Sequence, residues 1–168
     1  MKVVRLSLLA AAALAGPAFA QSAGGVTIYG LLDMGVDDYL LTSTIIGIQA
    51  QRLVRRLCTH CKEPYHPVEE VVAQMGLRRF SKAAQLTLYR PKGCEHCGHT
   101  GYFGRQSIME VLPMTDTLRS LIMRHATSSE LRAAAIKDGM ETMYENGLKQ
   151  SVSGVTTLEE VLRVTRED

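Results

Sequence analysis

The sequence predicts an α+β fold that is mainly helical and carries a small β-containing subdomain closed by zinc. Two observations lead to this prediction: apolar stripes at helical spacing beside capping signals after residue 40, and two C-x-x-C pairs that hold all four cysteines of the 168 residues. With 46% hydrophobic and 21% charged residues, the composition is that of an ordinary globular domain. The net charge of +2 and the aromatic content of 5% give no indication of nucleic-acid binding.

Residues 1–20 have the three parts of a secretory signal peptide. Lys2 and Arg5 give a positive start, residues 6–15 are apolar, and the small-x-small sequence AFA ends at residue 20. The apolar run is too short for a stable membrane anchor, so we expect a signal peptide-like segment.

Residues 21–39 are predicted to contain one strand. From Val26 to Val36 apolar residues alternate with a mixed set, as they do in a transmembrane barrel strand. Together with the signal peptide, residues 1–35 resemble the start of a Gram-negative porin. The sequence after residue 40 suggests no second strand of this kind, so a complete porin is excluded.

Residues 40–57 are expected to form a helix that leads into the metal module. Its predicted apolar stripe ends at Leu57, directly before Cys58 (Ile46, Ala50, Leu53, Val54 and Leu57). Arg52, Arg55 and Arg56 would then lie on one flank, either as a solvated face or as a contact for an anionic partner surface or a nucleotide phosphate.

Residues 58–112 are expected to be a tetracysteine zinc module. Each C-x-x-C turn directs two thiolates to one point, so the predicted ligands form a tetrahedral site (Cys58, Cys61, Cys94 and Cys97). Four thiolates leave no open position, which predicts a structural and not a catalytic zinc ion. Disulfide bonds between these cysteines are the alternative. Histidines in and near the pairs receive no predicted role.

Shorter elements are expected within this module. Pro67 is placed to start a helix that runs to Met75 and ends at Gly76. Residues 86–89 and 107–112 have the composition of short strands on either side of the second cysteine pair.

Residues 113–168 are expected to form a C-terminal helical domain. Thr115 precedes one apolar stripe, and a second helix over 131–137 follows a predicted capping box and ends at Gly139. A third helix is expected over 141–152. The last, over 158–164, follows a capping box formed by Thr157 and Glu160.

Three strings in this order resemble the C-terminal part of the type II secretion and type IV pilus assembly ATPases, the GspE/PilB family. They are LLDMGVDDYLLTSTIIGIQAQRLVRRLCTHC from residue 31, GCEHCGHTGYFGRQSIMEVL from residue 93, and GLKQSVSGVTTLEEVLRVTRED from residue 147. The resemblance runs from about Leu31 to Asp168. Because residues 30–36 fit both resemblances, we interpret the chain as an apparent chimera with its fusion seam there.

The resemblance implies a hexameric motor on the cytoplasmic side of the inner membrane, where ATP with Mg²⁺ drives pseudopilus or pilus assembly and protein secretion. It implies inner-membrane platform proteins and ATPase subunits as partners, and neither nucleic acid nor a small-molecule substrate. The chemistry requires a phosphate-binding loop of the form G-x-x-x-x-G-K-[ST], which these 168 residues do not contain. We therefore expect no catalytic residue, no nucleotide-binding residue and no ATPase activity from this chain alone.

The sequence thus favours a C-terminal fragment of a secretion ATPase that acts as a zinc-stabilised interaction module in the cytoplasm, peripheral to the inner membrane. One alternative is an exported envelope protein in the periplasm, with disulfide-bonded cysteines. A less favoured alternative is a nucleic-acid-binding zinc domain, which rests only on scattered arginines (Arg52, Arg55, Arg56, Arg78 and Arg79).

Overall fold

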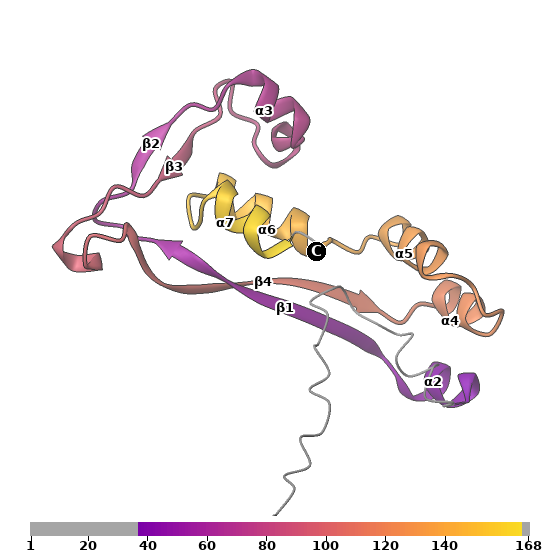
Figure 1. Cartoon of the computed structure of the whole chain (residues 1–168). Helices are drawn as coiled ribbons and strands as arrows, with labels where there is room; N and C mark the ends of the chain where they lie inside the picture. The colour runs from indigo at the N-terminus through magenta and orange to yellow at the C-terminus, as the bar shows by residue number, and fades with distance from the viewer. Residues whose placement is uncertain (1–36, 166–168) are drawn as a thin grey trace, which may run out of the picture.

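The structure, a computed structural model, describes residues 37–165, which form the predicted α+β fold. Helices lie along a long β-ribbon, and a second, short ribbon lies near one of its ends (Figure 1). The elements follow in the order α2 (Asp38–Thr44), β1 (Gly47–Leu57), β2 (Glu63–Tyr65), α3 (Glu69–Gln74), η1 (Leu77–Phe80), β3 (Leu88–Arg90), η2 (Glu95–Cys97), β4 (Tyr102–Pro113), α4 (Asp116–Ile122), α5 (Ser128–Lys137), α6 (Met143–Val152) and α7 (Leu158–Thr165).

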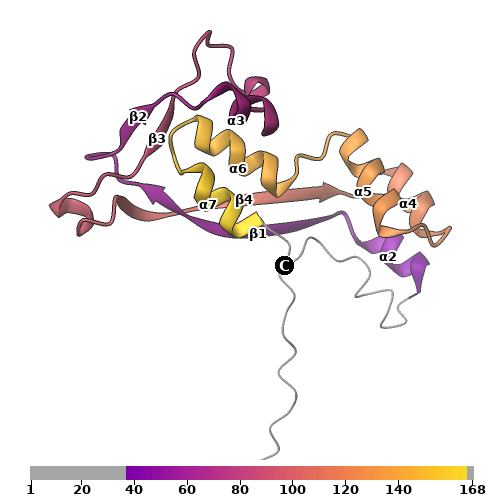
Figure 2. The ribbon, with the colours of Figure 1, turned by 45° about the horizontal axis from the view of Figure 1, so that its top comes forward.

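The long ribbon is the antiparallel pair β1–β4. Its register runs from Gly47 opposite Pro113 to Leu57 opposite Tyr102, with an irregularity between Arg55 and Leu57. One face is buried beneath α6 and α7, while α4 and α5 lie at the far end of the ribbon, near α2 (Figure 2). The short ribbon is the antiparallel pair β2–β3.

The predicted helix over residues 40–57 is wrong. The chain forms the short helix α2 and then the eleven-residue strand β1. Ile48 and Val54 are the β-branched residues of β1, and pairing along the whole length of β4 outweighs the helical spacing of the apolar residues. The predicted short strand over 107–112 is correspondingly part of the much longer β4.

The loss of that helix also changes the predicted arginine flank. Arg52 donates a hydrogen bond from its guanidinium to the carbonyl of Val164, and Arg55 binds the carboxylate of Glu160. Of the three arginines, only Arg56 lacks a partner among the described residues, so the nucleic-acid alternative loses most of its support.

The predicted helices after Pro113 are confirmed, as is the short helix that ends before Gly76. Thr127 and Glu130 form the expected reciprocal capping box. An additional box formed by Thr142 and Glu145 starts α6 and was not predicted. At α7 the Thr157 hydroxyl accepts the backbone N–H of Glu160, whereas the carboxylate of that glutamate binds two arginines.

The core is divided between the two ends of the molecule. One cluster packs α4 and α5 against the end of β4 (Leu112, Met114, Leu118, Ile122, Leu131, Ala135 and Met140). Another joins the segment between the cysteine pairs to α6 and α7 (Val72, Leu77, Leu86, Leu88, Leu148, Leu158 and Val161). The helices α6 and α7 approach closely at Gly147, where an added Cβ would lie 2.6 Å from Val161 Cγ1. The segment between the cysteines therefore shares its core with the last two helices.

The predicted signal peptide, porin-like strand and fusion seam fall on residues that lie outside the described range. Among residues 37–165, no helix is both long and apolar enough to cross a bilayer.

Candidate metal centre

The two ribbons bring the four cysteines together. Cys58 follows directly after β1, and Cys61 stands two residues before β2. Cys94 precedes η2, and Cys97 ends that helix shortly before β4 begins. The backbone N–H of Cys58 donates to the carbonyl of Gly101 at 3.0 Å, which holds the two cysteine turns side by side.

The sulfur spacing fits a tetrahedral metal site. The Sγ atoms of Cys58 and Cys94 are 3.9 Å apart, and Cys97 Sγ lies 3.8 Å from both Cys61 Sγ and Cys94 Sγ. All four Sγ atoms lie within 4.8 Å of one another. Sulfurs bound at about 2.3 Å to a central zinc ion would be separated by about 3.8 Å, whereas a disulfide requires about 2.05 Å. The donor set and its spacing therefore match Zn²⁺.

Backbone groups surround the sulfurs of the second turn. The N–H groups of Cys94 and Gly101 both donate to Cys97 Sγ at 3.2 Å. Gly101 has a φ of +77°, and a Cβ there would lie 2.3 Å from the Cβ of Pro91. This position therefore accepts only glycine without rearrangement of the turn.

The thiols are electrostatically unequal. Desolvation raises the pKa of Cys61 to about 12, against the effect of a hydrogen bond from the backbone of Gly93. Desolvation also acts on Cys97, but it is outweighed by hydrogen bonds from the backbone of Cys94 and Gly101 and by those from neighbouring thiols, which lower its pKa to about 6. One sulfur of the cluster is thus already stabilised as the thiolate that a metal ion requires.

The nearby histidines do not join the sulfur cluster, among the residues that the structure describes. The rings of His60 and His96 contact each other with centroids 4.2 Å apart, and Phe103 extends this contact at 4.5 Å from His96. His66 is hydrogen-bonded through Nδ1 to the carbonyl of Leu86 at 3.1 Å.

The turn between α6 and α7 fastens the helices to the strand that ends at Cys58. The N–H of Leu57 donates to the carbonyl of Val155 at 2.8 Å, and the Thr156 hydroxyl donates to the carbonyl of Arg55 at 2.8 Å. Lys62 Nζ donates to the carbonyl of Gly154 at 2.8 Å, directly after the first cysteine pair. The first cysteine turn and the last two helices are therefore joined by hydrogen bonds, and the segment between the cysteine pairs shares its core with these helices.

A buried carboxylate strengthens this junction, and only its capping position could have been inferred from the sequence. Glu160 is 2% exposed and accepts hydrogen bonds from the side chain and the backbone N–H of Arg55, and from the side chain of Arg163. Desolvation alone would raise its pKa, but the hydrogen bonds from Arg163 and Arg55 lower it to about 2. The carboxylate is therefore charged at neutral pH.

A family model described as Type II/IV secretion system protein matches residues 18–163. The chain belongs to this family. It is 50% identical over 147 residues to the type II secretion system protein E of Xanthomonas campestris pv. campestris, an alignment that covers 88% of this chain. The type II secretion system protein E of Dickeya dadantii is 45% identical over 139 residues, or 82% of the chain. The type IV pilus assembly ATPase PilB of Thermus thermophilus is 41% identical over 135 residues, or 80% of the chain.

The chain spans about a quarter of the length of the two type II relatives, 25% and 26%, and 15% of the pilus ATPase. The family match begins at residue 18. The resemblance found in the sequence was expected to begin at about Leu31, thirteen residues later. The family match therefore includes the residues 21–39 in which we placed a porin-like strand and a seam.

Proposed function

We propose that this chain is a zinc-stabilised interaction module from the C-terminal part of a type II secretion or type IV pilus ATPase. The observation that carries the zinc assignment is the sulfur spacing of 3.8–3.9 Å between cysteines of the two turns. A bound Zn²⁺ would be held by Cys58, Cys61, Cys94 and Cys97 and would cross-link the ends of four strands. Because four thiolates fill its coordination sphere, the ion would support the structure and would not activate water.

In this proposal the module has no nucleotide site of its own. ATP hydrolysis in the family requires a phosphate-binding loop, for which the sequence offers no match, and the fold instead supplies turns, a ribbon and packed helices. The names of the relatives support partners in secretion or pilus assembly. We propose inner-membrane platform proteins and intact ATPase subunits as those partners, with the module on the cytoplasmic side of the inner membrane.

Zinc content and thiol state test this function. The full chain, purified under anaerobic conditions, should show one zinc ion by native mass spectrometry and four alkylatable thiols after metal removal. A chelator should unfold the region around the cysteines, because metal binding and folding are coupled at such sites. Protein that carries no stoichiometric zinc and keeps its structure in chelator would overturn the proposal.

The second candidate, an exported protein with two disulfides, is favoured only by the signal peptide-like pattern of residues 1–20. Mass spectrometry distinguishes it: the exported form would lack residues 1–20, and its mass would be four hydrogen atoms below that of the reduced form of residues 21–168. The porin-like start also remains a proposal, and sequencing the gene across codons 30–36 tests whether a fusion seam is present.

A further inference from the structure

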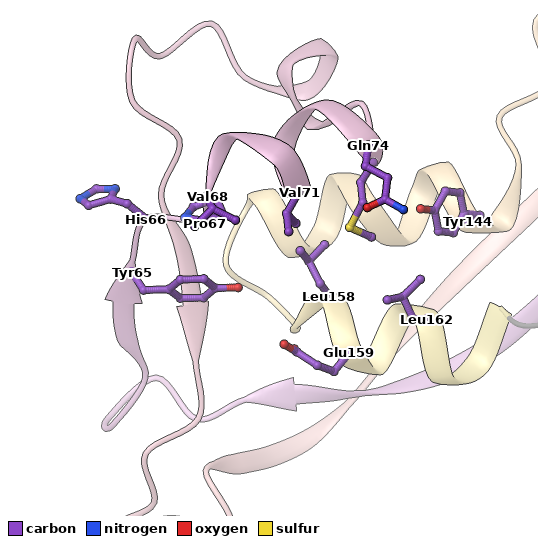
Figure 3. Close-up of a pocket in the computed structure, with 11 residues that line it drawn as sticks. Tyr65, His66, Pro67, Val68, Val71, Gln74, Tyr144, Leu158, Glu159 and Leu162 are labelled. Carbon is purple, nitrogen blue, oxygen red and sulfur yellow. The ribbon is translucent and has the colours of Figure 1, made fainter.

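A groove lies between the segment that connects the cysteine pairs and the last two helices. Its volume is about 750 Å³. Figure 3 shows side chains from β2 and α3 on one wall and from α6 and α7 on the other. The lining residues from the first wall are Tyr65, His66, Pro67, Val68, Val71, Gln74 and Met75; those from the second are Tyr144, Leu158, Glu159 and Leu162.

The walls of this groove are mainly apolar. Val71 of α3 and Leu158 of α7 point toward each other across it, with Leu162 one turn further along α7 (Figure 3). Leu158 is almost fully buried at the base, whereas Val68 at the rim is 62% exposed. Such a surface is suited to receiving apolar side chains from another molecule.

Four polar groups on the same walls form no hydrogen bond or ion pair with the residues that the structure describes. Within the described residues, no hydrogen bond or ion pair engages the hydroxyls of Tyr65 and Tyr144, the amide of Gln74 or the carboxylate of Glu159. His66 is turned away from the groove toward Leu86, as its hydrogen bond requires (Figure 3). The groove thus combines apolar walls with a small number of free polar groups.

The charge of the groove is negative. Glu159 is the one acidic group among the lining residues, and they include no lysine or arginine. Desolvation, followed by the charge of Glu159, raises the pKa of Tyr65, so its hydroxyl stays a neutral hydrogen-bond donor near neutral pH. A cation beside an apolar side chain is the complementary ligand.

We propose that this groove binds a short amphipathic segment of a partner protein, with its apolar residues against Val71 and Leu162 and a lysine or arginine at Glu159. An apolar helix face in a hydrophobic groove is a common mode of peptide recognition. The volume accommodates a few side chains and not a folded domain. This inference names the docking site of the interaction module and rests on the proposed function.

Fluorescence anisotropy with defined peptides tests the groove in the zinc-loaded full chain. The probe is a helical peptide of about twelve residues with leucines on one face and one lysine beside them. Two matched peptides carry glutamate in place of the lysine, or alanines in place of the leucines. The protein variants are Glu159→Lys, which reverses the charge in the groove, and Glu70→Lys, which makes the same change at an exposed residue of α3 outside the lining.

The lysine peptide should bind more tightly than the other two. Glu159→Lys should weaken its binding at least about fivefold and strengthen binding of the glutamate peptide, whereas Glu70→Lys should change both little. Val68→Ser, at the exposed rim, should weaken the binding of every peptide that carries the leucines. Equal binding of the lysine and glutamate peptides, or equal effects of the two charge reversals, would overturn the proposal. A stable dimer that blocks peptide binding would assign the groove to a second copy and also overturn it.

The zinc assignment is tested separately from the groove. Protein with one zinc ion and metal-dependent folding that binds none of the peptides would refute the docking site alone. Protein that carries no stoichiometric zinc and keeps its structure in chelator would refute the proposed function, whether or not the groove binds the peptides.

Discussion

The buried carboxylate of Glu160 gives the most direct test of how the last helix is held. Its two oxygens accept from Arg55 Nη2 at 2.6 Å, from Arg163 Nε at 3.0 Å and Nη2 at 2.9 Å, and from the backbone N–H of Arg55 at 3.2 Å. Replacing it in Glu160→Gln removes the charge and aims an amide N–H₂ at cationic donors. We therefore expect a marked loss of stability from a change that keeps the side-chain size.

The magnitude follows from the pKa of this group. A fall from 4.5 to about 2 corresponds to about 3 kcal/mol of folding free energy. Because Arg55 and Arg163 are 54% and 59% exposed, solvent screening reduces the expected loss to about 2–3 kcal/mol. A lowered folded-state pKa means that this stability is present above pH 4.5 and is lost as the pH falls toward 2. Wild type and Glu160→Gln should therefore differ at pH 7 and converge near pH 2.

Urea denaturation followed by circular dichroism, repeated at pH 7, 5 and 3, measures this difference. The control is Glu159→Gln, which removes the same charge from the adjacent, exposed position of α7. It should change the unfolding free energy by no more than about 0.5 kcal/mol. If Glu160→Gln is as stable as wild type at pH 7, or if the two keep a constant difference at every pH, the carboxylate does not stabilise the fold as argued.

Three further predictions concern the metal centre and the helix packing. Cys94→Ser, or zinc removal by chelator, should raise hydrogen exchange in β2, β3 and α3 and also in α6 and α7, which share their core, while α4 and α5 stay protected. Gly101→Ala should destabilise the fold by about 2 kcal/mol or more and weaken zinc retention, because its backbone is left-handed and its new methyl would overlap Pro91. Gly147→Ala should lower the free energy of unfolding, measured by urea denaturation, by about 1–3 kcal/mol. Adding Val161→Ala to this variant should restore part of the lost stability, because the smaller side chain leaves space for the new methyl group.

Each of these three predictions would be contradicted by one specific result. If hydrogen exchange increases only in the segment between the cysteines, the shared core does not couple the stability of this segment to that of α6 and α7. Unchanged stability in Gly101→Ala would mean that the second cysteine turn relaxes freely. Strictly additive effects of the two substitutions at Gly147 and Val161 would show that these residues do not press on each other.

Sequence reasoning located features whose signal is local. The four cysteines lie together because two short turns can present them, and Thr127 with Glu130 starts a helix because the capping geometry spans only three residues. The strand conformation of β1 is not determined by neighbouring residues alone. It depends on pairing with β4, some fifty positions further along the chain, and this pairing overrides the helical spacing of residues 46–57.

The role of Glu160 shows the same limit in side-chain chemistry. Its position after Thr157 predicted a capping residue, and the backbone half of that motif is present. Its carboxylate instead binds Arg55, which lies far away in the sequence and comes close only through the docking of α7 on β1. The groove was missed for a similar reason, because its two walls come from segments about seventy to one hundred residues apart.

The shared core bears on how this region can be rebuilt. A graft that carried residues 58–97 into another protein would leave Val72, Leu77 and Leu88 facing water, because Leu148, Leu158 and Val161 stay behind. Conversely, deleting the stretch between the two cysteine pairs would strip the last two helices of the side chains that cover them. Residues 58–97 therefore cannot be transferred to another protein on their own. An engineered or natural exchange of this segment should include α6 and α7.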